Sequence, residues 1–271
     1  MSLSAVRGPG HHARMSASRL GFGTLAWATA HNGELSPAER VREIAKGTVV
    51  VLRTAPAQIR QRLGMRNPRA LAYDVDRLPI PDSSIAKQAE ELCREASSPM
   101  LVNHCWRTYA WGMILATHDG LHPDPELFYV ASMLHDLALT DQFRGYAPMP
   151  CFGARAALLA HDWAQARGWP AQRCTTLADA ICLHLNVEVP RERGPEAQLL
   201  QAGAGLDVIG LRHWQLTPQT VAAVQARYPR LDMKKAAYPL FVAESHRRTR
   251  AQLLRRWLMF GPLVRHSQFD E

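Results

Sequence analysis

A histidine and an aspartate stand side by side in an apolar stretch of the chain. His135 and Asp136 lie within YVASMLHDLALTD, residues 129–141, where apolar residues flank them on both sides. A carboxylate in such surroundings loses so much solvation that it must protonate or find a partner, and a metal cation is one effective partner. Because neighbouring residues sit about 100° apart around a helix, both side chains can reach one ion beside it. The pair therefore predicts a metal site.

Two other His-Asp pairs occur in different settings. His118-Asp119 is followed by a glycine and then by a His-Pro step, which is typical of a helix end in solvent. His161-Asp162 lies in GARAALLAHDWAQARG, where polar residues share the helix and indicate a half-exposed face. We expect neither pair to bind metal.

A metal ion takes three or four protein ligands, and three further residues could supply them. In LVNHCWRTYAWGMILA, a polar file of His104, Arg107 and Thr108 runs along one face of an apolar helix, although a lone buried histidine can also be a core residue. Asp207 lies in LLQAGAGLDVIGL, where it is either a buried ligand or the cap of a broken helix. His184, in ADAICLHLNVEV, fits the site and the core equally well.

The glycines around Asp207 are a separate signal. Gly203, Gly205 and Gly210 each cost a helix interior about 1 kcal/mol relative to alanine. A close approach of this backbone to another helix would offset that cost. The segment is therefore expected to pack tightly against a neighbouring helix.

The elements that must position these side chains are helices. Apolar residues recur at helical spacing through the chain of 271 residues, and the alternation typical of strands is scarce. Gly, Pro or Asp-Gly signals separate most of the segments. The pattern predicts an all-α fold with helices at about 37–63, 84–96, 99–117, 124–138, 153–167, 171–184, 195–211, 217–227 and 233–258.

The first part of the chain differs in character from the rest. Residues 1–20 are basic and rich in small residues, without the apolar run of a secretory signal, and predict a leader. Ser36-Pro37 is a plausible helix start, and the prolines between 64 and 83 indicate a linker. We therefore expect an N-terminal extension, leader then helical, at 1–70, followed by a helical domain with C-terminal helices at 71–271.

Composition narrows the class of protein. No window approaches the roughly 18 unbroken apolar residues of a membrane span, and the five cysteines include no C-x-x-C, which argues against a zinc ribbon or a disulfide framework. The net charge of +8 comes largely from dispersed arginines without a nucleic-acid-binding motif. We expect a cytoplasmic protein with a small-molecule substrate and no nucleic-acid or membrane partner, and a homo-oligomer stays open.

The order of these residues resembles a known superfamily. His104, then His135-Asp136, then Asp207, on separate helices, is similar to the pattern of the HD superfamily of metal-dependent hydrolases. The stretches NHCWRTY, MLHDLALT, AICLHLNV and ARYPRLDMKKAAYPLF resemble its cyanamide hydratase-like branch, over about residues 81–244. The chain departs from that branch at Pro150, where an acidic residue is common, and at Cys105, where a serine is common.

The resemblance implies an HD-type helical bundle with one divalent transition metal, zinc or iron(II), since mixed imidazole and carboxylate ligation suits both. The ligands that it implies are His104, His135, Asp136 and Asp207, with His184 lining the site or ligating. The reaction that it implies is attack of metal-bound water on a small nitrile-like or amide-like substrate, such as cyanamide to urea. The developing anion could draw on a donor from Arg107, Thr108 or Thr140.

Two alternative functions stay open, a phosphohydrolase and a metal-stabilised binding module. Phosphohydrolase members of the superfamily often carry H-D-I-G-K, whose lysine can meet a phosphate, whereas Leu139 stands at that position here. Diiron oxygenase members place a further histidine before the fourth helix, where Pro150 and Cys151 stand here, so one metal is expected rather than two. The remaining alternative is a metal-stabilised helical binding module without turnover.

The choice among the three His-Asp pairs can be tested directly. Replacing His118 with alanine or Asp119 with asparagine should leave the metal content of the purified protein unchanged, because this pair is expected at a solvated helix end. Elemental analysis of both variants beside the wild type measures it. Loss of metal from either variant would identify this pair, rather than His135-Asp136, as the metal site.

Overall fold

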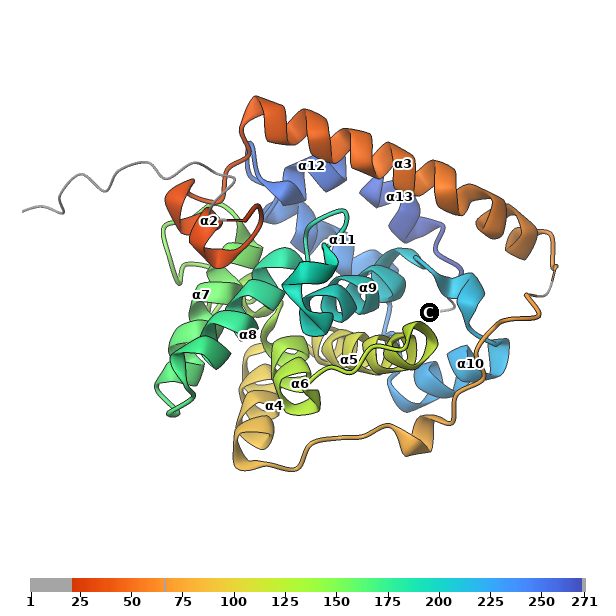
Figure 1. Cartoon of the computed structure of the whole chain (residues 1–271), viewed down its shortest axis with the longest axis horizontal. Coiled ribbons are helices and arrows are strands. Elements are labelled where there is room, and N and C mark those ends of the chain that lie inside the picture. Colours follow the sequence, from red (N-terminus) through yellow and green to blue (C-terminus); the bar gives the residue numbers. More distant parts are fainter. Residues whose placement is uncertain (1–20, 66, 270–271) are drawn as a thin grey trace, which may run out of the picture.

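The computed structural model describes residues 21–65 and 67–269. Within these ranges helices dominate, strands are absent, and the only β-type pairings are isolated bridges from Leu71 to Leu216 and from Cys151 to Ser245. The predicted all-α fold is confirmed (Figure 1). In the described part of the chain, none of the helices has the length and apolar character needed to cross a membrane. The predicted leader falls in residues 1–20, outside the described residues.

The helices occur close to the predicted positions. They are, in chain order, α2 (Leu25–Ala30), α3 (Pro37–Arg62), α4 (Ser84–Ala96), α5 (Pro99–Asp119), α6 (Pro125–Leu134), α7 (Phe152–Gln165), α8 (Ala171–Leu183), α9 (Pro195–Ile209), α10 (Pro218–Arg227), α11 (Met233–Ala243), α12 (Arg250–Trp257) and α13 (Phe260–Arg265). Short 3-10 turns lie at Val75–Arg77, Leu137–Leu139, Arg191–Arg193 and His213–Gln215.

Helices α5 and α9 pack against each other at the centre of the fold. Most of α5 is buried, and so is most of α9. A Cβ atom at Gly203 would overlap the backbone carbonyl of Thr108, so glycine lets the two backbones come close. The close approach expected from the glycines of this segment is confirmed, whereas Gly210 ends α9 in the left-handed conformation.

The N-terminal helices contact the rest of the chain. Helix α2 packs on α7 and α8, and its Trp27 is buried, with the indole Nε1 donating to Glu39 Oε1 at 2.9 Å. Ser36 and Glu39 form a capping box at the start of α3, which then runs along α12. The buried Arg250 guanidinium donates to the carbonyl of Gly23 at 3.2 Å. The division at residue 70 stays a prediction, but residues on both sides of it share buried contacts.

Two predicted helices were wrong in extent. The segment 233–258 is not one helix, because α11 ends at Ala243 and α12 starts anew after Thr249, which accepts a hydrogen bond from the backbone N–H of Gln252. Arg248, between them, adopts a positive φ. The helix predicted at 124–138 ends at Leu134, so the His-Asp pair lies at a helix end instead of inside the helix. Helices α2 and α13 were not predicted, since six residues are too few for a clear periodic signal.

The N-terminal contacts predict a large effect of Trp27. Trp27→Ala should lower the free energy of unfolding by about 3–5 kcal/mol, because it empties a buried site of indole size. Trp257→Ala is the matched control, since that side chain is 52% exposed. Chemical denaturation of both variants measures the difference. Equal effects would show that residues 21–62 are attached loosely, as an appendage would be.

Candidate metal centre

The end of α6 places His135 and Asp136 at the middle of the molecule. His135 is the C-cap of α6, and the 3-10 turn at Leu137–Leu139 follows Asp136. Both side chains are buried. His135 Nδ1 lies 2.8 Å from the carbonyl oxygen of Ser132, which can only accept, so Nδ1 carries the hydrogen and the lone pair of Nε2 points away from α6.

His104 of α5 faces this pair. Its Nε2 lies 3.2 Å from Nε2 of His135 and 3.4 Å from Oδ2 of Asp136, and the distance from His135 Nε2 to the same oxygen is also 3.4 Å. Atoms that bind one zinc ion tetrahedrally at 2.0–2.2 Å stand roughly 3.4 Å apart. These residues therefore form a group whose donor atoms have the spacing of a metal site.

His184 approaches the group from the end of α8. Its Nδ1 contacts the carbonyl oxygen of Ile181, so Nε2 again carries the lone pair, and this atom lies 3.7 Å from Oδ1 of Asp136. Burial and the neighbouring His135 lower the pKa of His184 to about 3, which keeps its imidazole neutral. A neutral imidazole is the form that binds metals or accepts a proton.

Asp207 of α9 lies behind His104. Its Oδ2 is 2.7 Å from His104 Nδ1, and its oxygens also accept from Arg107 at 2.7 and 3.0 Å and from Trp111 Nε1 at 3.0 Å. Although burial opposes ionisation of Asp207, the Arg107 cation and His104 hold the pKa of this carboxyl well below its usual range. The predicted ligand Asp207 is thus placed beside Nδ1 of His104, whereas the other donors gather at Nε2, and it is not part of their group.

The donor set fits a cation. With Nδ1 of His104 donating to Asp207, and Nδ1 of His135 donating to a carbonyl, both Nε2 lone pairs point at the same place as the Asp136 carboxylate. Two lone pairs cannot bond to each other, so a proton or a metal ion must lie between them. Burial opposes protonation of His104, yet hydrogen bonds to Asp136 and Asp207 raise its pKa to about 9. The site attracts positive charge at this point.

Three predicted donors are placed elsewhere. The guanidinium of Arg107 is fully engaged by Asp207, by the side chain of Met233 and by the carbonyls of Tyr228 and Pro229. Thr140 donates to the carbonyl of Leu137 at 2.7 Å. The hydroxyl of Thr108 is buried without a hydrogen-bond partner among the described residues. Arg107, Thr108 and Thr140 are not among the described residues that line the cavity at the donor group.

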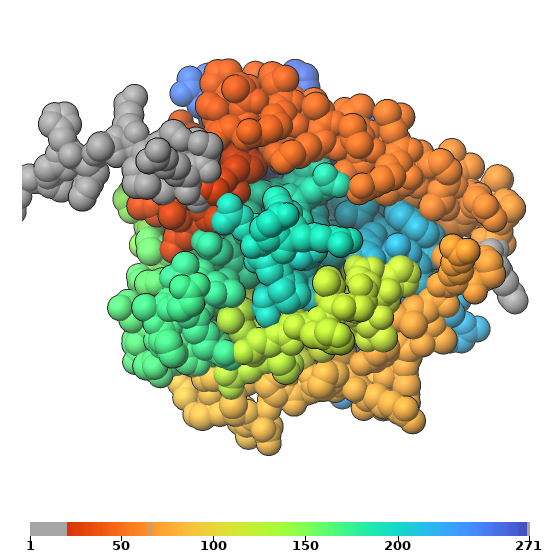
Figure 2. Space-filling model, viewed as in Figure 1, coloured from red at the N-terminus to blue at the C-terminus, as the bar shows by residue number. Residues whose placement is uncertain are grey.

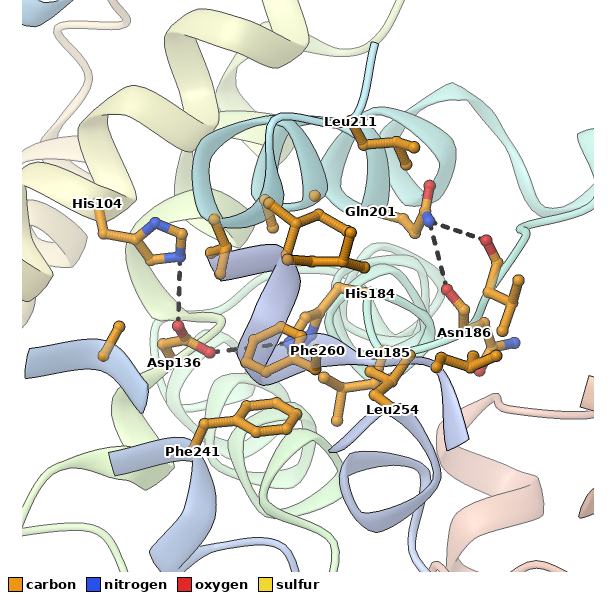
Figure 3. A pocket seen from close by; sticks show the side chains of 18 of the residues that line it. His104, Asp136, His184, Leu185, Asn186, Gln201, Leu211, Phe241, Leu254 and Phe260 are labelled. Carbon is orange, nitrogen blue, oxygen red and sulfur yellow. Dashed lines mark hydrogen bonds and ion pairs between the residues drawn. The ribbon is translucent and has the colours of Figure 1, made fainter. Parts of the chain in front are cut away.

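The donor group lies at a cavity of about 240 Å³ (Figure 3). His104, His135, Asp136 and His184 all contribute to its lining. Its other walls come from α3, α9 and the C-terminal helices α11, α12 and α13. The centre is therefore buried in the fold, yet borders a space large enough for a small organic molecule.

Two polar residues of the cavity were missed from the sequence. Asn186 accepts from the Arg250 guanidinium at 2.8 Å, and Gln201 Nε2 donates to the carbonyls of Asn186 and Val187 (Figure 3). Asn186 stands in the apolar stretch ICLHLNV, so an isolated amide was the available signal. Gln201 had no comparable signal, because one glutamine in α9 is unremarkable in sequence.

Comparison with known proteins gives one consistent result. No family model matches the chain. Over 157 residues the chain is 24% identical to the cyanamide hydratases DDI2 and DDI3 of Saccharomyces cerevisiae, an alignment that covers 57% of this chain and 69% of each yeast protein. The likeness is to cyanamide hydratases. It supports a distant relation to these enzymes, while the wider assignment to the HD superfamily stays a prediction.

The other two His-Asp pairs are placed at the surface. Asp119 accepts from Arg212 at 2.6 and 2.8 Å and also contacts His118, and both side chains of this pair are partly exposed. Asp162 accepts from the hydroxyl of Tyr146 at 2.8 Å. In the part of the chain that the structure describes, neither pair belongs to a group of metal-ligand spacing.

The positions of Asp136 and Asp207 predict different responses to the same change. Asp136→Asn should abolish metal binding, because it removes the one carboxylate of the donor group. Asp207→Asn should weaken metal binding by about 10–100-fold and leave a measurable affinity, because the carboxylate of Asp207 binds Nδ1 of His104 and orients its ring. Titration of the metal-stripped proteins with zinc measures both affinities. Equal and complete loss in the two variants would instead support Asp207 as a direct ligand.

Proposed function

We propose that the chain is a metal-dependent hydratase or hydrolase that adds water to a small nitrile-like or amide-like substrate, with cyanamide to urea as the first reaction to test. The observation that carries this proposal is the convergence of His104, His135 and Asp136 on one point beside a cavity with largely apolar walls. The distant relation to cyanamide hydratases supports the same reaction.

The residues present suit one divalent transition metal, either zinc or iron(II). His104, His135 and Asp136 would hold it, with His184 beside them and Asp207 fixing the ring of His104. Such an ion lowers the pKa of a coordinated water toward about 7 and polarises the bond that is attacked. A second ion is not expected, because among the described residues only this group has metal-ligand spacing.

The chain's own residues would orient the attacking water and surround the substrate with apolar side chains. His184 is neutral, its Nδ1 is bound to the Ile181 carbonyl, and its free lone pair at Nε2 faces Asp136 and the cavity. It is therefore placed to accept a hydrogen bond from the attacking water and so to orient it, whereas its lowered pKa disfavours full proton uptake. A substrate that fills the cavity would displace water from its apolar walls, which would strengthen electrostatic interactions within the site.

The two alternatives receive less support. A phosphohydrolase needs cationic groups to meet its substrate, but no lysine or arginine occurs among the described residues that line the cavity. A metal-stabilised module without turnover has no need of a cavity beside its metal. A cytoplasmic location, a homo-oligomer and the absence of nucleic-acid and membrane partners stay predictions from composition.

The proposal predicts metal-dependent formation of urea. Purified protein should contain about one zinc or iron per chain and convert cyanamide to urea, and His135→Ala should remove both the metal and the activity. His161→Ala, a surface histidine next to an aspartate, is the matched control and should keep both. Elemental analysis and a urea assay measure the two properties.

The alternatives appear as distinct outcomes of the same experiment. Phosphate release from nucleotides or phosphodiesters, without formation of urea, would favour a phosphohydrolase. Full metal content with no turnover of any compound tested would favour the binding module. Two irons per chain would point to an oxygenase.

A further inference from the structure

The cavity walls away from the donor group are largely apolar. Beyond the histidines and Asp136, the lining consists mainly of valine, leucine, isoleucine, methionine and phenylalanine side chains. The polar exceptions are one threonine and three amides, Thr54, Gln58, Asn186 and Gln201. Asn186 and Gln201 are already bound to other protein groups, which reduces what they can offer a ligand.

An aromatic column leads away from the donor group. The ring of Phe152 lies 5.9 Å from that of His184, Phe241 lies 5.9 Å from Phe152, and Phe260 stacks on Phe241 at 4.0 Å. All four rings line the cavity, and Figure 3 labels His184, Phe241 and Phe260. A ligand that extends from the donor group along this column would be in contact with aromatic faces and edges, which favour apolar and planar groups.

The cavity is also larger than cyanamide requires. A cavity of roughly 150 Å³ with apolar walls is enough to bind benzene, and this one measures about 240 Å³. Cyanamide has a nitrile and an amino group but no hydrocarbon part, so it would leave the apolar walls unfilled. A ligand with a hydrocarbon group would cover them and gain affinity from the apolar surface removed from water.

We infer that the preferred substrate is an uncharged organonitrile that carries a hydrocarbon substituent, an alkyl chain of several carbons or an aryl ring. This inference rests on the proposed function, which supplies the reacting nitrile, and adds the nature of its substituent. The nitrile lies at the donor group and the substituent lies along the aromatic column. The absence of lysine and arginine from the described lining excludes a substituent that needs a cationic partner.

Helix α3 forms the outer wall of this substituent site. Val50, Val51 and Thr54 line the cavity from α3, and α9 lies opposite with Val208 and Ile209. The surface is hollowed beneath α3 (Figure 2), and Val51, which lines the cavity, is largely exposed, so an apolar compound would enter on this side. The hydrocarbon chain would thus be held between the N-terminal helix and the core of the fold.

The inference predicts a dependence on chain length. Binding of acetonitrile, propionitrile, butyronitrile and pentanenitrile to the full-length, metal-loaded protein should tighten by about fourfold for each added methylene, the gain expected from burying one such group. Benzonitrile should bind more tightly than acetonitrile. Ligand-observed NMR measures affinity without requiring turnover, and amide formation from the same compounds gives kcat/KM, which should rise in the same order.

Two substitutions in the cavity wall test separately the volume of the cavity and the polarity of its wall. Ala237→Phe on α11 adds bulk to the lining and should weaken the binding of pentanenitrile by about tenfold or more. Ala236 is the neighbour of Ala237 but is not among the described residues that line the cavity, so Ala236→Phe is the matched control. Val50→Gln places an amide in the half-buried wall formed by α3. It should weaken the binding of pentanenitrile by about tenfold, with little change in the melting temperature of the protein.

Each outcome bears on one proposal or the other. Nitrile affinity that is flat or falls with chain length, or that is unaffected by Val50→Gln, overturns the inference, and cyanamide hydration in the same sample would leave the proposed function standing. Affinity that rises with chain length, together with no hydration of any nitrile or of cyanamide, supports the apolar site and overturns the proposed reaction.

Discussion

The buried carboxylate of Asp207 is the point on which the centre of this protein depends. It is fully enclosed, and it joins Arg107 and Trp111 of α5 to α9 through bonds of 2.7–3.0 Å. An unpaired charge in such a position would cost several kcal/mol, so the ion pair and the packing of the two helices require each other. Through Nδ1 of His104 the same carboxylate sets the direction of an imidazole lone pair.

This arrangement links the stability of the fold to the chemistry of the site. Gly203 lets α9 approach α5 closely enough for the carboxylate to reach His104, and the early end of α6 turns His135 and Asp136 toward the same place. The result is a set of lone pairs that repel one another unless positive charge lies between them. The largely apolar cavity beside that set offers a hydrocarbon group favourable contacts.

Most of the helices and several features of the site could be predicted from the sequence, because their signals lie within short stretches of the chain. Helical periodicity placed most helices, glycine in a helix signalled a close approach, and an aspartate among apolar residues signalled a partner for its charge. The sequence could not decide that Arg107 binds Asp207, because the two residues lie 100 positions apart and pairing between helices leaves no periodic trace. For the same reason the apolar lining looked like ordinary core. The break between α11 and α12, which begins after Ala243 and includes the positive φ of Arg248, was also missed.

The donor residues and several helices of the cavity wall come from different parts of the chain. The donor group comes from α5 and the end of α6, with His184 beside it at the end of α8, all in the middle of the sequence. Helices α3, α12 and α13, which line the cavity, come from its two ends. Substitutions in the terminal helices can therefore reshape the space offered to a ligand while the ligands of the metal keep their supports. In this chain, the residues suited to bind a metal and the helices that shape the space beside them can therefore change independently.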